Sequence, residues 1–206
     1  MALVKLNNRG VRSATAFGSI TGLGSMVFIK KLTASSSATV SFVDGTSDVV
    51  LDNSYKEYLF TFNNMHPATD DVFFTFNLSI DSGSNYNVTK TTTVFRAYHT
   101  EGGAAPTLAY YPEIDLAQST AFQNIVGEAG NANDESISGY LHLFNPSSTT
   151  FVKHFMTNAN QNTYHNLAMQ TFIAGYGNTT SAVDAVQFKM SSGNTDAGDI
   201  CLYGIN

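Results

Sequence analysis

Five histidines carry the most versatile side-chain chemistry in this chain of 206 residues, because imidazole binds metals and transfers protons near neutral pH. They are His66, His99, His142, His154 and His165. None of them lies at the short fixed spacing of a zinc site. His142 and His154 fall on neighbouring predicted strands among aromatic residues. This placement favours a structural pair on an aromatic face, with a metal site as the weaker alternative.

Three pairs of acidic residues stand close together, and glycoside hydrolysis requires two carboxylates across a cleft. The pairs are Asp44 with Asp48, Asp70 with Asp71, and Asp134 with Glu135. Each pair falls in a predicted turn or loop, where carboxylates accept hydrogen bonds from nearby backbone N–H groups. The pairs therefore indicate turns, with calcium binding or catalysis as weaker alternatives. Because the chain also lacks a nucleophile elbow, a phosphate-binding loop and a dinucleotide motif, we expect a non-enzymatic protein without a cofactor.

Two loop segments contain more Tyr, Asn and Gly than a purely structural loop needs. Tyr110 and Tyr111 precede a proline, and Tyr176 and Asn178 lie in a Gly-Tyr-Gly-Asn run. A tyrosine ring combines an apolar face with a hydroxyl group, so such loops can stack on a sugar ring or pack on a neighbouring subunit. These four residues are the candidate contacts for a host-surface glycan or a protein partner, with ordinary loop packing as the alternative.

Alternation of apolar and polar residues dominates the chain from position 26 onward and predicts β-strands. The strands are expected at 26–32, 38–43, 57–63, 72–80, 93–99, 121–126, 137–145, 150–157, 167–176, 183–190 and 198–205. In the strand at 72–80 one face is apolar, and the other, with Thr75, Asn77 and Ser79, is expected to face water. The stretch 100–120 is the longest predicted loop. Helical spacing around 117–125 allows one short helix there.

The composition agrees with an all-β domain. Only 13% of the residues are charged, 43% are hydrophobic, and 25 of the side chains are Phe or Tyr. We therefore predict a two-sheet antiparallel β-sandwich of the jelly-roll type over residues 26–206. Residues 1–25, rich in Gly, Ser and Asn, are predicted to form an extended N-terminal arm. The lone Cys201 cannot form an internal disulfide and is expected to act as a small hydrophobic residue.

The charges are unevenly placed along the chain. The net charge is −6, and all 16 acidic residues follow position 43. Five of the ten basic residues precede them: Lys5, Arg9, Arg12, Lys30 and Lys31. Lys5, Arg9 and Arg12 are therefore candidate attachment residues on an acidic or repeating partner surface, with a solvated arm as the alternative. The acidic balance argues against nucleic-acid binding, and the lack of a long apolar run argues against a signal peptide or membrane insertion.

Several segments resemble virion proteins of tailed bacteriophages, especially the cyanophage and pelagiphage types that infect marine bacteria. The segments are 1–9, 49–62, 80–86, 144–154, 186–193 and 202–205. The resemblance implies a virion structural protein, made in the host cytoplasm, with a jelly-roll-like fold and no catalytic residues. It implies a tail-fibre or appendage component with host-surface binding; capsid decoration on the phage head and a glycan-binding module are the alternatives. Its partners would be other virion proteins and further copies of this chain, a trimer being favoured.

Overall fold

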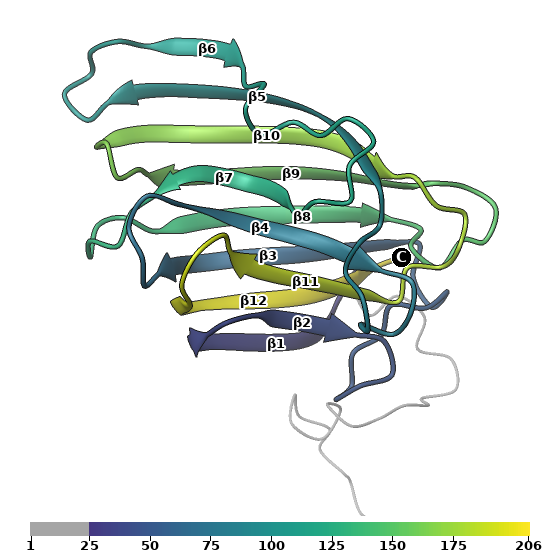
Figure 1. Cartoon of the computed structure of the whole chain (residues 1–206). Helices are drawn as coiled ribbons and strands as arrows, with labels where there is room; N and C mark the ends of the chain where they lie inside the picture. The colour runs from purple at the N-terminus through teal and green to yellow at the C-terminus, as the bar shows by residue number, and fades with distance from the viewer. Residues whose placement is uncertain (1–24) are drawn as a thin grey trace, which may run out of the picture.

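The computed structural model describes residues 25–206, which form twelve β-strands and no helix (Figure 1). The strands are β1 (Met26–Ser37), β2 (Val40–Val43), β3 (Glu57–Pro67), β4 (Val72–Ser79), β5 (Lys90–Thr100), β6 (Thr107–Tyr110), β7 (Gln123–Ala129), β8 (Ile137–Phe144), β9 (Lys153–Asn162), β10 (Leu167–Gly177), β11 (Ala185–Met190) and β12 (Thr195–Ile205). No helix that could span a membrane occurs among these residues.

The strands form two antiparallel sheets that face each other as a β-sandwich (Figure 1). The large sheet has eight strands in the order β1-β12-β3-β8-β9-β10-β5-β6, and the small sheet has the order β2-β11-β4-β7. The small sheet covers only part of the large one, and β5 and β6 extend beyond it. The predicted fold class of an all-β, two-sheet antiparallel sandwich is therefore confirmed.

Successive strands cross between the two sheets eight times, at β1–β2, β2–β3, β3–β4, β4–β5, β6–β7, β7–β8, β10–β11 and β11–β12. A double-sheet jelly roll has this crossing pattern. The jelly-roll type therefore stays our prediction for this sandwich. Two hairpins, β5–β6 and β9–β10, are inserted into this frame and remain within the large sheet. They add four strands beyond β8, and these strands form much of the surface described below.

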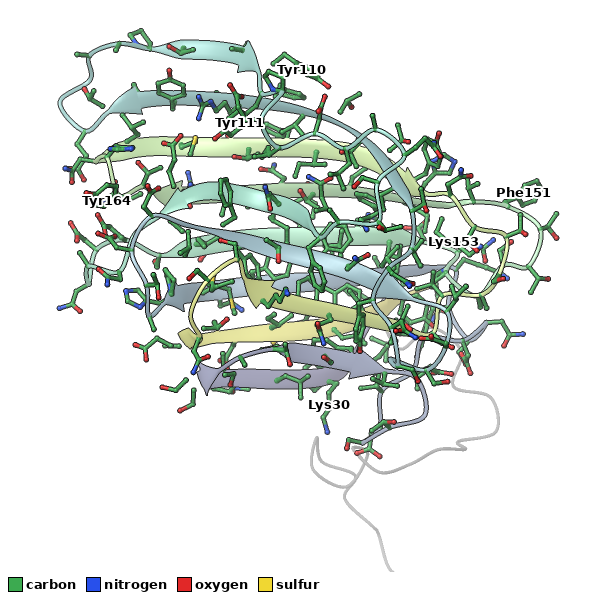
Figure 2. All side chains as sticks on the ribbon, viewed as in Figure 1. Lys30, Tyr110, Tyr111, Phe151, Lys153 and Tyr164 are labelled. Atoms are coloured by element: carbon green, nitrogen blue, oxygen red, sulfur yellow. The ribbon has the colours of Figure 1, made fainter. Side chains whose placement is uncertain are left out.

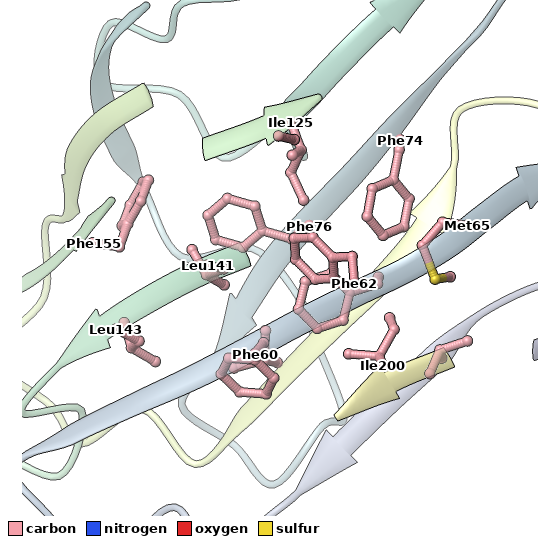
Figure 3. Packing of buried hydrophobic residues seen from close by; sticks show 14 of the residues in the cluster. Phe60, Phe62, Met65, Phe74, Phe76, Ile125, Leu141, Leu143, Phe155 and Ile200 are labelled. Carbon is pink, nitrogen blue, oxygen red and sulfur yellow. The ribbon is translucent and has the colours of Figure 1, made fainter. Parts of the chain in front are cut away.

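Phenylalanine rings from both sheets fill the space between them (Figure 3). The rings of Phe62 on β3 and Phe74 on β4 meet edge to face with their centroids 5.2 Å apart. Phe76 on β4 meets Phe155 on β9 in the same way at 5.0 Å. Edge-to-face contacts place the positive edge of one ring against the negative face of the other, so they add to the gain from apolar burial. These contacts fix how the two sheets stack.

The short helix that the spacing around 117–125 allowed does not form, and the strand predicted at 121–126 appears as β7. Gln118 has a φ of 50°, a left-handed conformation that interrupts a helix, and β7 begins at Gln123. The amide of Gln123 is buried, where it donates to the carbonyl oxygen of Ile114 at 2.8 Å and accepts from the hydroxyl of Thr92 at 2.8 Å. Tertiary contacts therefore outweigh the local helical spacing. The stretch predicted as the longest loop also contains a short strand, β6.

The polar face of β4 does not face water, which corrects a second prediction. Thr75, Asn77 and Ser79 are all buried. The Asn77 amide donates to the carbonyl oxygens of Tyr86 at 2.6 Å and Thr120 at 3.0 Å. The segments before β5 and β7 therefore cover the outer side of the small sheet. The predicted arm at 1–25, with Lys5, Arg9 and Arg12, lies outside the described residues except for Ser25.

Candidate functional site

The outer face of the large sheet carries an uncharged surface over five strands, β8, β9, β10, β5 and β6. Strand alternation and register identify its outward residues. They are Ser138, Tyr140, His142, Phe144, His154, Met156, Asn158, Asn160, Asn162, Ala168, Gln170, Phe172, Ala174, Tyr176, Thr91, Thr93, Phe95, Ala97, His99, Leu108 and Tyr110. None of these is Asp, Glu, Lys or Arg. We call this surface the uncharged face.

Large apolar side chains are exposed on the uncharged face. Phe95, Leu108, Tyr110, Tyr140 and Met156 lie there, and each is at least 40% exposed. They account for half of the ten large hydrophobic side chains that are exposed in residues 25–206. Contiguous exposed apolar area of this kind marks binding surfaces in soluble proteins.

A ridge and two depressions give the uncharged face its relief. The ridge is the stacked pair of Phe95 and Phe172, whose ring centroids are 4.8 Å apart with planes inclined by 12°. On one side lies a depression of about 580 Å³ that includes Ala97 and Ala168. On the other side lies one of about 380 Å³ that includes Ala174. The depressions exist because small residues stand beside large ones.

The depression of about 380 Å³ is walled by aromatic and histidine side chains. Its lining includes Phe144, His154 and Tyr176, and it continues past Met156 into a hollow of about 150 Å³ beside the ridge. The rings of His154 and Tyr176 have centroids 6.0 Å apart. This arrangement offers flat ring surfaces to a ligand on both sides of Ala174.

His142 and His154 both lie on the uncharged face, but they do not form the predicted pair. The register places His142 opposite Met156, so each histidine contacts an aromatic ring instead. His142 packs on Phe144 with centroids 4.2 Å apart, and its Nε2 lies 3.0 Å from a carboxylate oxygen of Glu57. Among the described residues no cluster of three or more His, Cys, Asp or Glu side chains could hold a metal ion.

Amide side chains supply hydrogen-bonding groups beside the rings. Gln170 donates to Asn158 Oδ1 at 2.9 Å, and Asn160 donates to the carbonyl oxygen of Met169 at 3.2 Å. In residues 25–206, Asn158 Nδ2, Asn160 Oδ1 and Gln170 Oε1 make no hydrogen bond. Each amide can both donate and accept, so these atoms are available to a polar ligand.

The structure separates the four tyrosine and asparagine candidates that the sequence indicated, and Figure 2 labels two of them, Tyr110 and Tyr111. Tyr110 is on the uncharged face, and a hydrogen bond to the Asp115 carboxylate raises the pKa of its hydroxyl. Tyr176 is also on this face. Tyr111 is buried, with the Arg96 guanidinium 3.7 Å from its ring centroid. Asn178 lies beyond the end of β10 and donates to Gln118 Oε1 at 3.0 Å. Only the rings of Tyr110, which is exposed, and of Tyr176, which is half-buried, therefore join the surface.

The acidic pairs stabilise loops. Asp44 Oδ1 accepts from the backbone N–H of Leu51 at 2.8 Å, and Asp70 Oδ1 accepts from that of Asn131 at 3.2 Å. Glu135 is buried and accepts from the N–H of Ala132 at 2.8 Å. Each carboxylate thus satisfies a backbone donor of a turn or of a neighbouring loop.

Two buried lysines point away from the uncharged face, and the sequence analysis missed them. Lys90 on β5 and Lys153 on β9 both pair with Gly177 on β10, so they flank that glycine at one end of the sheet. Lys90 donates to Asn77 Oδ1 and to the carbonyl oxygen of Val88, and burial lowers its pKa to about 7. Burial also lowers the pKa of Lys153. The alternation of the sequence could have identified them, because each lysine occupies an inward position in its strand.

The uncharged face is thus suited to non-covalent binding, because it presents aromatic rings, amides and depressions. The buried lysines lie on the opposite side of the same strands and are not part of this surface. Comparison of the chain with protein-family models, with curated proteins and with solved structures finds no match.

Proposed function

We propose that this protein is a non-enzymatic structural component of a bacteriophage virion, in a tail fibre or appendage, that binds the host-cell surface. The observation that carries the binding role is the uncharged face, with its exposed aromatic side chains and depressions. The resemblance to virion proteins of tailed phages supports the place in the virion. Other virion proteins and further copies of the chain, in a trimer, are its expected partners, with no role for nucleic acid or membrane insertion.

The position of the uncharged face supports this role. It lies mainly on the two inserted hairpins, β5–β6 and β9–β10, which extend the large sheet beyond the frame of eight crossing strands. A frame that carries its own core can hold a binding surface on added strands without losing stability. The same resemblance also supports the alternative role, decoration of the phage head. Immunogold labelling on the tail supports our proposal, whereas labelling on the capsid alone would assign the head role.

Cell binding of matched phenylalanine variants tests the binding role. We expect the fluorescently labelled full chain to bind at least one strain in a panel of marine bacteria that includes cyanobacteria. Phe95→Ser should weaken this binding about tenfold, because it removes an aromatic contact of about 1.4 kcal/mol. Flow cytometry over a concentration series measures the apparent dissociation constant.

Phe151→Ser is the matched control for this experiment. Phe151 is 68% exposed, compared with 45% for Phe95, and lies in the loop between β8 and β9 (Figure 2). Its loss removes exposed aromatic area of the same kind from a different place, so binding should stay at the wild-type level. Equal binding by both variants, or no binding to any strain by the wild-type chain, would argue against the proposal.

A further inference from the structure

We infer that the uncharged face binds a neutral polysaccharide, whose chain lies along the outward row of β10 with sugar rings on both sides of the Phe95–Phe172 ridge. The inference rests on the proposed function and names the ligand chemistry of the same face. Three features carry it: the absence of charge, the relief along β10, and the mixture of aromatic rings with amides.

The charge pattern selects a neutral ligand. The nearest carboxylates, Glu57, Glu101 and Asp115, lie at the margins and already contact His142, Asn162 and Tyr110 of the face. The Arg96 side chain lies on the inner side of β5 and pairs with Glu128 at 2.9 Å. An acidic polysaccharide or a nucleic acid needs lysine or arginine at its contact surface, and the outward positions of these five strands supply neither.

The relief of the face suits an extended chain. The outward row of β10 runs from Ala168 through Gln170, Phe172 and Ala174 to Tyr176. Eight steps of about 3.3 Å give this row a length of about 26 Å. The depression of about 580 Å³ lies on one side of the ridge and the depression of about 380 Å³ on the other. A polymer can occupy both depressions at once, whereas a single sugar fills only part of one.

The polar groups distinguish a sugar from an apolar partner. Asn158, Asn160 and Gln170 lie among the rings and have unused amide atoms within residues 25–206. Burying such groups against an apolar protein surface or a lipid would cost free energy, because their hydrogen bonds to water would be lost. A sugar ring presents C–H groups on its face and hydroxyl groups at its edge. It can therefore stack on an aromatic ring and hydrogen-bond to the neighbouring amides.

Affinity electrophoresis of the full chain tests this inference. Native gels contain one neutral polymer (laminarin, mannan or dextran) or the anionic polymer alginate. We expect at least one neutral polymer to retard the wild-type chain and alginate to leave its mobility unchanged. Tyr176→Ala should weaken the retardation about fivefold, because one stacking ring is lost. Tyr164→Ala is the matched control, since Tyr164 is exposed in the β9–β10 loop and is not one of the outward residues of β10.

Thermal melting confirms that both variants are folded before their retardation is compared. Absence of retardation by all three neutral polymers would overturn the inference, as would equal retardation by alginate or equal effects of the two tyrosine substitutions. If Phe95→Ser still weakens cell binding in that case, the proposed function stands and the ligand is a protein. If light scattering shows that Phe95→Ser converts an oligomer to a monomer, the face belongs to a second copy, and both the inference and the cell-binding role fail.

Discussion

Replacing Phe188 with alanine is expected to lower the free energy of unfolding by about 3–5 kcal/mol. Phe188 on β11 is fully buried at the centre of the sandwich. Its ring centroid lies 5.3–6.3 Å from those of five other phenylalanines, Phe42, Phe60, Phe62, Phe74 and Phe76. These neighbours come from both sheets, so they cannot close the cavity without moving one sheet against the other. We therefore expect the free energy of unfolding to fall by the full cost of an unfilled cavity.

Urea unfolding followed by circular dichroism measures this loss as a lower midpoint at unchanged slope. Phe151→Ala is the control, because that ring is 68% exposed and its removal should change stability by less than about 0.5 kcal/mol. Phe188→Leu leaves a smaller cavity, so its loss in the free energy of unfolding should lie between those of Phe188→Ala and Phe151→Ala. A loss below about 1 kcal/mol in Phe188→Ala would contradict the ring cluster as the centre of the core.

The free energy of unfolding is expected to rise with pH by about 2 kcal/mol between about pH 7 and pH 9, and Lys90→Met should remove this rise. Lys90 is fully buried, and burial lowers its pKa from 10.5 to about 7. Above pH 7 the folded chain therefore releases this proton, while the unfolded chain keeps it. Because the unfolded state then binds more protons, raising the pH stabilises the folded state until the pH approaches the unfolded pKa.

Urea titrations at about pH 7, pH 8 and pH 9 give, for each variant, the slope of the free energy of unfolding against pH. Lys56→Met is the matched control, since Lys56 is exposed and should keep the slope of the wild-type chain. An unchanged slope in Lys90→Met would show that the Lys90 ammonium stays protonated in the folded chain. In that case the carbonyl oxygens of Asn77 and Val88 would be sufficient to hold the charge.

The strands of the fold were predictable because period-two alternation is a local property. The strand from Val72, for example, was expected from its alternating apolar residues and appears as β4. Its second face was predicted wrongly, because the loops that cover Asn77 are linked to it only by tertiary contacts with Tyr86 and Thr120. Gln118 and Gln123 show the same limit, since buried hydrogen bonds and backbone conformation decided against the helix.

The candidate surface was only partly predictable. Tyr110 and Tyr176 were identified from composition, but Tyr111 has the same residue type and is buried. The ridge depends on sheet register, because Phe95 and Phe172 are far apart in sequence and meet only where β5 pairs with β10. The absence of charge is likewise a property of five strands together. A single strand could not reveal it, since every strand has uncharged stretches.

Oxidation of two methionines on host-bound protein tests the central claim, that the uncharged face is the binding surface, most directly. Met156 lies in the middle of this face and Met26 on β1, at the far edge of the same sheet, and each is 52% exposed. Equal exposure predicts similar oxidation by dilute peroxide in the free protein. On cells, we predict severalfold protection of Met156 and no protection of Met26, measured by peptide mass spectrometry. Bound protein in which Met156 oxidises as fast as Met26 would contradict the claim.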